Sequence, residues 1–323
     1  MKPAMSYPRR VRIARKTLEA PDICSFELVA VDGGALPPFT AGAHIDVLLD
    51  GEVVRQYSLC NHPRETDRYL IAVLREPASR GGSSRMHALR EGDELDISEP
   101  RNHFALAPDA RRHLLLAGGI GITPILCMAE QLASEGAAFE LRYCTRSATR
   151  TAFLQRIRQS AFSAKAQIHH DDGAAAQKLD LPAVFAAPQA GDHLYVCGPG
   201  GFIEAVLAAA RAAGWPTEAL HREYFAAGPT SIADDGAFDV QIASSGALIR
   251  VAPQQSVVAA LAAVGIEVPV SCEQGVCGTC LTGVLDGTPD HRDLYLTDDE
   301  RARGDQFTPC CSRAKSPRLV LDL

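Results

Sequence analysis

The chain contains 323 residues, of which 46% are hydrophobic and 22% are charged, and its formal net charge is −7. This length exceeds what one hydrophobic core usually supports, so we expect two or three domains. The acidic balance argues against nucleic acid as a partner, and no run of eighteen apolar residues predicts a membrane span. The N-terminal stretch lacks the apolar segment of a signal peptide, so the ten cysteines predict a reducing, cytoplasmic environment.

Residues 1–108 are predicted to form a small antiparallel β-barrel. Short segments rich in β-branched and aromatic residues are separated there by Gly, Pro, Asp and Asn, which is typical of such barrels. The expected strands are 11–14, 25–29, 44–49, 53–59 and 69–74. A short helix is expected to follow them, from about Ser84 to Leu89.

Two segments of this domain are candidates for a ligand site. The first lies at the end of a strand, where alternate side chains point to opposite faces. The second presents bare backbone amides and two hydroxyls at a helix start, with an arginine nearby, which suits a phosphate group. The residues are Arg55, Gln56, Tyr57 and Ser58 in the strand, and Gly81, Gly82, Ser83 and Ser84 at the helix. Considered alone, either segment could equally be ordinary exposed structure.

Residues 109–226 are predicted to form a doubly wound α/β domain with a parallel sheet. The continuous apolar run Leu114–Ala117 is typical of a buried parallel strand. Strands and helices then alternate along the segment, as they do in folds of this class. The further expected strands are 139–144, 166–170 and 193–197, and the expected helices are 124–134, 152–158 and 201–213.

Two glycine-containing loops of this domain predict a nucleotide site, because each lies between a strand and a helix, where backbone amides can approach a phosphate. The loops contain Gly118, Gly119, Gly121 and Thr123, and then Cys197, Gly198 and Pro199. Thr123 is expected to cap the next helix, and Pro124 stands where the dinucleotide fingerprint would have its last glycine. Cys197 is expected to face the cleft beside Thr123, with a buried strand-end cysteine as the alternative.

The adenosine ribose of a nucleotide is expected after the strand 139–144, at Arg146 and Ser147. This stretch has no acidic residue to bind a ribose 2′-hydroxyl, and its two side chains could accept a 2′-phosphate. The residues by themselves therefore leave NADH and NADPH as open alternatives.

Residues 227–236 are small and polar and include Pro and Gly, so they are predicted to be a linker to a third domain at 237–323. The third domain is expected to begin with a hairpin and a helix. The expected strands are 238–243 and 248–251, and the expected helix is 256–264.

Four cysteines in the third domain predict an iron–sulfur cluster. Cys272, Cys277 and Cys280 follow a C-x4-C-x2-C pattern, and Cys310 comes after a further twenty-nine residues, which is plant-type [2Fe–2S] spacing. Glycines within the loop let it turn tightly and leave backbone N–H groups free to face the sulfurs. Zinc and disulfides are the alternatives, but there is one C-x2-C pair only, and a reducing environment disfavours disulfides. Cys311 competes with Cys310 for the fourth position.

These motifs occur in an order that resembles the phthalate dioxygenase reductase family, close to the vanillate O-demethylase reductases, within the ferredoxin–NADP reductase superfamily. The matching segments are Arg55–Ser58, Gly81–Ser84, Ala117–Pro124, Cys197–Pro199, Phe225, Cys272–Cys280, Asp290–Asp293 and Cys310–Lys315. The resemblance implies three domains: an FMN-binding β-barrel, an NADH-binding Rossmann-like α/β domain, and a β-grasp domain that carries the [2Fe–2S] cluster.

The resemblance also implies roles for individual residues. Those that would hold the flavin are Arg55, Gln56, Tyr57 and Ser58, with Ala72, Val73 and Leu74 along the ring and Gly81, Gly82, Ser83 and Ser84 at the phosphate. Those nearest the reacting atoms would be Ser58, Thr123, Cys197 and Phe225, the last at the flavin face near the nicotinamide position. Members of the family use FMN rather than FAD and prefer NADH, and the short loop 60–68 has no obvious adenine platform. The family pattern assigns Cys310, rather than Cys311, as the fourth ligand.

The implied activity is that of an NADH-dependent electron-transfer reductase. NADH releases two electrons together and the cluster accepts one, so a flavin must bridge the two. The implied route runs from NADH through FMN and the cluster to a Rieske non-haem iron oxygenase of aromatic dioxygenase or O-demethylase type. Asp298, Asp299 and Glu300 are expected either to help a transient partner to dock or to be an ordinary solvated face, and we expect a monomer.

Three alternatives to this activity remain open. The first is a reductase of the same architecture that uses FAD. The second is one that serves a diiron or carnitine-type monooxygenase, because such reductases share the same motifs. The third belongs to another class of protein, a zinc-bearing interaction module on an inert nucleotide-binding fold.

Overall fold

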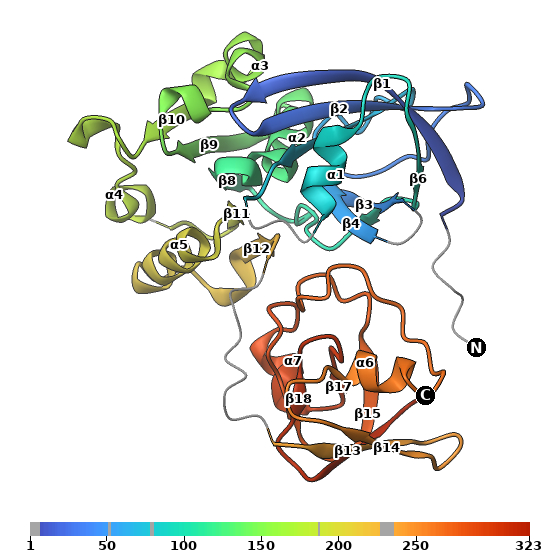
Figure 1. The fold of residues 1–323 in the computed structure, drawn as a ribbon. Helices are drawn as coiled ribbons and strands as arrows, with labels where there is room; N and C mark the ends of the chain where they lie inside the picture. The colour runs from blue at the N-terminus through green and yellow to red at the C-terminus, as the bar shows by residue number, and fades with distance from the viewer. Residues whose placement is uncertain (1–6, 51–52, 78–80, 187, 227–235) are drawn as a thin grey trace. The chain divides into compact units, whose positions relative to one another are not determined.

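The computed structural model describes residues 7–50, 53–77, 81–186, 188–226 and 236–323. The chain divides into two compact units, one spanning Ser6–Glu223 and the other containing Tyr224–Leu323 (Figure 1). None of the helices in the described ranges is both long and apolar enough to cross a bilayer.

The first part of the larger unit is an antiparallel barrel, as expected. Its strands are hydrogen-bonded in the order β4-β3-β6-β1-β2-β5, with β7 paired to β3. An isolated antiparallel bridge between Leu59 and Ile71 joins the two ends of this order, which leaves fewer unpaired edge groups. The elements are β1 (Arg9–Ala20), β2 (Ile23–Ala30), β3 (Ala43–Leu49), β4 (Val53–Ser58), β5 (Tyr69–Leu74), α1 (Gly82–Ala88), β6 (Glu94–Ile97) and β7 (Arg101–Asn102).

The second part of the larger unit is a sheet of order β10-β9-β8-β11-β12, in which β10, β9, β8 and β11 run parallel. The carboxyl ends of parallel strands share one edge of a sheet, and open α/β folds bind their ligands there. The elements are β8 (Arg112–Gly118), α2 (Ile122–Ser134), β9 (Ala138–Thr145), α3 (Leu154–Gln159), β10 (Ala166–His170), α4 (Leu181–Phe185), β11 (Asp192–Gly198), α5 (Gly200–Ala212) and β12 (Leu220–Tyr224).

The start of α2 differs from the expectation. A 3₁₀ turn at Gly119–Gly121 runs directly into α2, so Gly121 occupies the N-cap and the helix begins at Ile122. The expected cap role of Thr123 is therefore wrong. Its hydroxyl instead donates a hydrogen bond of 3.1 Å to the carbonyl of Ile120.

Several elements were not expected from the sequence, and three short ones in the larger unit are β6, β12 and α4. The strands β6 and β12 carry charged residues among their apolar ones, and the helix α4 has five residues only. Each is too short to show a clear pattern of apolar residues in the sequence. Contacts with neighbouring elements of the fold stabilise each of them. The strand β12 matters most, because its residue Glu223 is hydrogen-bonded to Ser58 at the end of β4.

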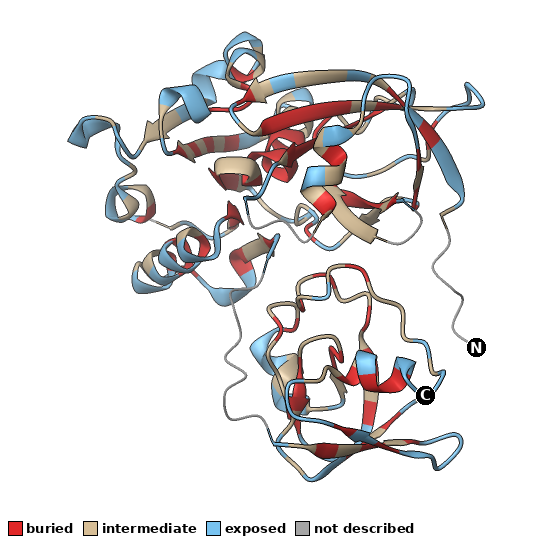
Figure 2. Ribbon diagram, viewed as in Figure 1, coloured by how far each residue is buried: buried red, intermediate tan, exposed pale blue. Residues whose placement is uncertain are grey.

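One hydrophobic core joins the barrel to the parallel sheet. Ile23 and Ala72 from the barrel belong to the same buried cluster as Leu115, Leu126 and Tyr143 from the α/β part. Figure 2 shows the buried residues concentrated in these strands and in α2. Barrel and sheet therefore form one unit, and the boundary between residues 108 and 109 stays a prediction.

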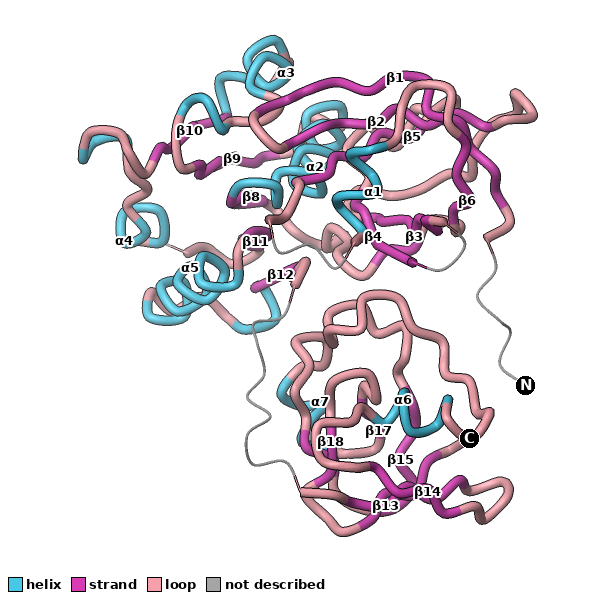
Figure 3. The backbone as a smooth tube through the Cα atoms, in the orientation of Figure 1, coloured by secondary structure: helices cyan, strands magenta, loops and turns pink. Residues whose placement is uncertain are grey.

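The smaller unit contains a mixed sheet of order β14-β13-β19-β15-β17 and a separate two-stranded pair, β16 with β18. Figure 3 shows that most of this unit is loop. The segment from Cys272 to Cys280 contains no helix or strand. Residues 227–235 of the predicted linker lie outside the described residues. The elements are β13 (Phe238–Ile242), β14 (Leu248–Val251), α6 (Val257–Ala262), β15 (Thr282–Asp286), β16 (Pro289–Asp290), α7 (Asp298–Arg303), β17 (Gln306–Phe307), β18 (Arg313–Ala314) and β19 (Arg318–Leu321).

The two glycine loops of the larger unit touch each other through their backbones. A Cβ atom on Gly121 would lie 2.2 Å from the carbonyl oxygen of Cys197 and 2.6 Å from the amide nitrogen of Gly198. A Cβ atom on Gly198 would in turn lie 2.9 Å from the Cα atom of Gly118. Glycine is therefore required at this contact, which brings the two expected nucleotide loops side by side.

Gly121→Ala is expected to lower the free energy of unfolding by about 1–3 kcal/mol, because the added methyl group overlaps the backbone of Cys197. The matched control is Gly201→Ala in the first turn of α5, where a Cβ atom meets nothing within 4 Å. Alanine also favours helix at that position. Chemical denaturation of both variants tests the contact, and equal stabilities would contradict it.

Candidate functional site

Ser58 and Glu223 connect the barrel to the last strand of the α/β sheet. The Ser58 hydroxyl, at the end of β4, donates a hydrogen bond of 3.2 Å to Oε2 of Glu223 in β12. Desolvation raises the pKa of the Glu223 carboxyl to about 8, and the hydrogen bond from Ser58 opposes that shift. Sequence reasoning missed Glu223, because a glutamate in a short polar strand gives no sign that its carboxyl group is enclosed.

Cys197 is completely buried near the end of β11, and Thr123 is almost completely buried in the first turn of α2. Burial raises the pKa of the Cys197 thiol well above its ordinary value, and the nearby charge of Glu223 adds to the shift. Ser58, Cys197 and Glu223 therefore form one group at the junction of barrel and sheet. The structure brings two of the expected residues together here and adds a third.

The expected phosphate site lies where β4 meets the start of α1. Gly81 has a φ of 94°, and a Cβ atom on Gly82 would lie 2.5 Å from Cγ and 2.6 Å from Nε of Arg55. The arginine stem therefore lies against the bare glycine backbone, which suits a site for a phosphate group. The Ser83 hydroxyl accepts a hydrogen bond of 3.1 Å from the amide of Glu76, and Ser84 is exposed.

Gln56 and Tyr57 are held in place by neighbouring parts of the barrel. Nε2 of Gln56 donates a hydrogen bond of 3.0 Å to Oδ1 of Asp46, a buried carboxylate that also pairs with Arg101. Burial raises the pKa of the Tyr57 phenol. A fixed amide and an un-ionised phenol at a strand end suit a neutral, hydrogen-bonding ring system.

The three expected ring-lining residues of β5 differ in how far their side chains are buried. The Val73 side chain lies in the barrel core, and that of Ala72 lies in the core shared with the α/β sheet. Leu74, the last residue of the strand, is half-buried. The role of these residues stays a prediction, and the burial of two side chains leaves their backbone as the part that could face a ring.

Two aspartates lie beside the expected ribose site. Arg146 is exposed after β9, and the next strand along the sheet edge, β10, runs parallel to β9 and ends at His170. The amide of Asp171 donates a 3.0 Å hydrogen bond to the carbonyl of Thr145, and the amide of Asp172 donates one of 3.2 Å to the carbonyl of Arg146. The end of β10 therefore places two acidic residues next to the stretch after β9, which has none of its own. The parallel pairing of these strands was the signal that could have revealed them.

Phe225 directly follows β12, and 38% of its surface is exposed. A large aromatic side chain that is left partly exposed at the end of a strand suits a contact with another flat group. Its role at a flavin face stays a prediction.

The four expected ligand cysteines form two pairs. The thiols of Cys272 and Cys277 share a hydrogen bond, and so do those of Cys280 and Cys310. The hydrogen bond from Cys272 lowers the pKa of Cys277 to about 6, which favours a thiolate in that pair. The amide of Gly275 faces the Cys310 sulfur, as the glycine-rich loop predicted.

This arrangement fits a [2Fe–2S] cluster better than a single zinc ion. Each iron of such a cluster binds two thiolates, and the structure supplies two pairs.

Cys311 lies against Gly275 of the loop and belongs to neither of the two pairs. A Cβ atom on Gly275 would lie 2.4 Å from the Cys311 sulfur, and that sulfur lies 3.3 Å from the Thr308 hydroxyl. It also shares a hydrogen bond with Cys310. The hydrogen bond that Cys310 shares with Cys280 supports the assignment of Cys310 as the fourth ligand.

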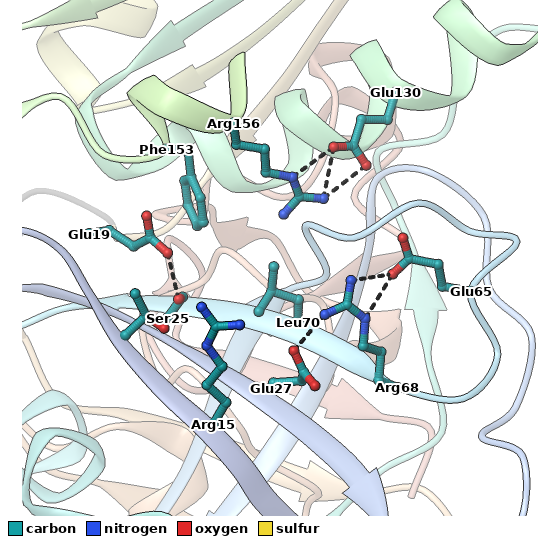
Figure 4. Close-up of a pocket in the computed structure, with 11 residues that line it drawn as sticks. Arg15, Glu19, Ser25, Glu27, Glu65, Arg68, Leu70, Glu130, Phe153 and Arg156 are labelled. Carbon is teal, nitrogen blue, oxygen red and sulfur yellow. Dashed lines mark hydrogen bonds and ion pairs between the residues drawn. The ribbon is translucent and has the colours of Figure 1, made fainter. Parts of the chain in front are cut away.

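A cavity of about 350 Å³ elsewhere in the larger unit contains none of the expected site residues (Figure 4). It lies between β1, β2 and β5 of the barrel and the helices α2 and α3, and charged side chains line it. Arg156 forms a two-bond ion pair with Glu130, and Arg68 pairs with Glu27 and Glu65. The charges of these side chains are paired with one another, so they give no argument for a ligand in the cavity.

Comparisons with known proteins agree with this geometry. A family model described as a 2Fe-2S iron-sulfur cluster binding domain matches residues 240–315. A second model, described as the N-terminal domain of a dimethylamine monooxygenase subunit DmmA-like protein, matches residues 98–220.

Whole-length relatives extend the agreement to the full chain. The vanillate O-demethylase oxidoreductase of Pseudomonas sp. (strain HR199 / DSM 7063) is 56% identical over 314 residues, which cover 97% of this chain and 99% of the relative. The structure of phthalate dioxygenase reductase, described as modular for electron transfer from pyridine nucleotides to [2Fe-2S], matches with a TM-score of 0.75 and 41% identity over 97% of each chain.

An intact type IV self-sufficient cytochrome P450 monooxygenase also matches, with a TM-score of 0.86, 40% identity and 98% coverage of this chain. The chain spans 41% of that larger protein. The expected resemblance and fold class are thereby confirmed, and the chain belongs to the phthalate dioxygenase reductase family.

Proposed function

We propose that this protein is the NADH-dependent reductase component of an oxygenase system, which carries electrons from NADH through FMN and a [2Fe–2S] cluster to a Rieske-type oxygenase. The observation that carries the proposal is the arrangement of Cys272, Cys277, Cys280 and Cys310 as two pairs of thiols. They lie in the same chain as a barrel and a parallel sheet that share one core.

The residues around the end of β4 suit FMN. Arg55, with the backbone of Gly81 and Gly82, would hold the phosphate, and Gln56 and Tyr57 would meet the ring and its side chain. Bound FMN would supply the conversion from two-electron to one-electron transfer that a nicotinamide and a cluster lack. Held between barrel and sheet, the Ser58 hydroxyl would be oriented by Glu223 toward the reacting edge of the ring.

The loop after β4 favours FMN over FAD. The side-chain oxygen of Asn61 accepts a 2.9 Å hydrogen bond from the amide of Leu70, and its nitrogen donates one of 3.1 Å to the carbonyl of Arg68. The loop is thus closed upon itself by hydrogen bonds. Residues 60–68 include no Phe, Tyr or Trp on which an adenine ring could stack.

The acidic residues at the end of β10 favour NADH over NADPH. Their backbones are bonded to Thr145 and Arg146, where the adenosine ribose of an α/β nucleotide site lies. A carboxylate accepts a hydrogen bond from a ribose 2′-hydroxyl and repels a 2′-phosphate. Asp171 and Asp172 would therefore supply the selectivity that Arg146 and Ser147 left open.

The partner would meet the smaller unit in a transient complex. The first turn of α7 contains Asp298, Asp299 and Glu300, and the Asp298 side chain is 95% exposed. Exposed carboxylates of this kind steer a basic partner surface, and such contacts weaken as salt is added. A monomeric reductase would suit this brief encounter.

Cys310→Ser and Cys311→Ser test the cluster assignment. The first variant is expected to lose its iron, because it breaks the pair with Cys280, and the second is expected to keep it. Both should still bind FMN and reduce it with NADH, because the barrel and sheet are unchanged. Iron content, flavin released on denaturation, and anaerobic flavin bleaching by NADH measure these outcomes. Loss of iron from the Cys311 variant alone would reverse the assignment.

Glu223→Gln tests the carboxyl group at the junction. With the pKa of Glu223 raised to about 8, the group is neutral below that pH and gains a negative charge as the pH rises through it. A negative charge opposes the arrival of electrons nearby, so the rate of flavin reduction by NADH should fall above about pH 8. The variant should lack this fall. Glu218→Gln, at an exposed site just before β12, is the control and should keep it. An identical pH profile in all three proteins would contradict the assigned role.

Asp171→Asn/Asp172→Asn tests the choice of nucleotide. The double variant is expected to raise kcat/KM for NADPH relative to NADH by about tenfold, because two like charges beside the ribose are removed. Asp109→Asn removes an exposed carboxylate just before β8, at the opposite end of the strands, and should leave the ratio unchanged. Steady-state kinetics with both nucleotides measure the ratio, and an unaltered preference in the double variant would refute the assignment.

A further inference from the structure

Asp293 is a carboxylate buried beside the cysteine loop, and its side chain has no exposed surface. A Cβ atom on Gly275 would lie 2.9 Å from both Cα and Cβ of Asp293. The amide of Leu294 donates a 2.9 Å hydrogen bond to the carbonyl of Gly275. The segment around Asp293 is therefore attached to the middle of the loop that carries three of the proposed ligands.

The same carboxylate reaches the turn that carries the fourth proposed ligand. The Ser312 hydroxyl lies 3.5 Å from Oδ1 of Asp293 and accepts a 3.1 Å hydrogen bond from the amide of Arg292. The Thr308 hydroxyl lies 3.0 Å from that of Ser312 and 3.3 Å from the Cys311 sulfur. Ser312 and Thr308 are both completely buried. A buried chain of polar groups thus runs from Asp293 into the turn that contains Cys310.

The positive charge around Asp293 is limited. The amide of Leu296 donates a 2.7 Å hydrogen bond to Oδ2. Nη2 of Arg301 lies 3.9 Å from the same oxygen, and Nδ1 of His291 lies 3.6 Å from Oδ1. Of these three groups, Arg301 alone carries a fixed charge, and its side chain is 29% exposed and therefore partly screened. The negative charge of Asp293 is thus incompletely offset at the cysteine loop.

We propose that Asp293 is a positioning residue for the [2Fe–2S] cluster, which clamps the cysteine loop to the Cys310 turn and lowers the reduction potential of the bound cluster. The inference rests on the proposed function, because it needs the cluster ligands assigned above. A buried negative charge raises the energy of the reduced cluster, because it repels the added electron. Groups just behind metal ligands orient them and tune their potentials.

Asp293→Asn tests this proposal, because it keeps the size of the side chain and removes its charge. The matched control is Asp290→Asn, three residues earlier in the same segment, where the carboxylate pairs with Arg292 and is 29% exposed. Each full-length protein is assayed for iron and acid-labile sulfide. The potential of its cluster is measured by an anaerobic redox titration followed by electron paramagnetic resonance.

The Asp293→Asn protein is expected to favour the reduced cluster at least tenfold more than the wild type does, which is a rise of about 59 mV for a one-electron couple. The Asp290→Asn protein should stay near the wild-type value. Equal potentials and equal iron content in all three proteins would overturn the proposal. A wild-type protein without iron would overturn the proposed function instead.

Ser312→Ala covers the case in which Asp293→Asn cannot hold a cluster at all. It cuts the link to the Cys310 turn and leaves the carboxylate in place. A cluster that is retained with a changed resonance spectrum, or that is lost faster to an iron chelator, supports the clamp. Wild-type spectrum and wild-type chelation rate in this variant would overturn it.

Discussion

The convergence of four thiols from two distant segments is the constraint on which the rest of the account depends. Three come from one loop, and the fourth comes from a turn thirty positions further along. The loop can bring its sulfurs together because Gly275 and Gly278 both have positive φ, at 70° and 67°. A Cβ atom on Gly278 would lie 2.2 Å from the Tyr295 ring, so that ring packs directly on the loop backbone. The backbone conformation of the loop therefore determines whether the sulfurs can reach the cluster.

The same principle governs the larger unit, where function depends on segments that the shared core holds together. Ser58 and Glu223 are 165 residues apart in the sequence and are hydrogen-bonded in the structure. Gly121 and Cys197 touch through their backbones because no side chain intervenes. If barrel and sheet were separate bodies, the hydrogen bond between Ser58 and Glu223 would have no fixed geometry. Their common core explains why one chain can hold a flavin and a nucleotide in a defined relation.

The sequence predicted well wherever one short segment carries the whole signal. The cysteine spacing, the glycine loops and the barrel strands are local patterns, and the structure places each of them in an element of the expected kind. It predicted poorly where a residue acts through a partner from elsewhere in the chain. Nothing in the sequence distinguishes Glu223, the aspartates at the end of β10 or Asp293 from other acidic residues. The roles assigned to them depend on contacts with residues from other strands or turns. The cap expected at Thr123 failed for a related reason, because the preceding 3₁₀ turn starts the helix early.

The measurement that tests the central claim most directly is the content of iron, acid-labile sulfide and zinc in protein purified without oxygen. Two irons and two sulfides per chain, with no zinc, are the result that this account predicts. Zinc without sulfide, or cysteines found oxidised to disulfides with no metal, would contradict it, because the electrons would then have no carrier beyond the flavin.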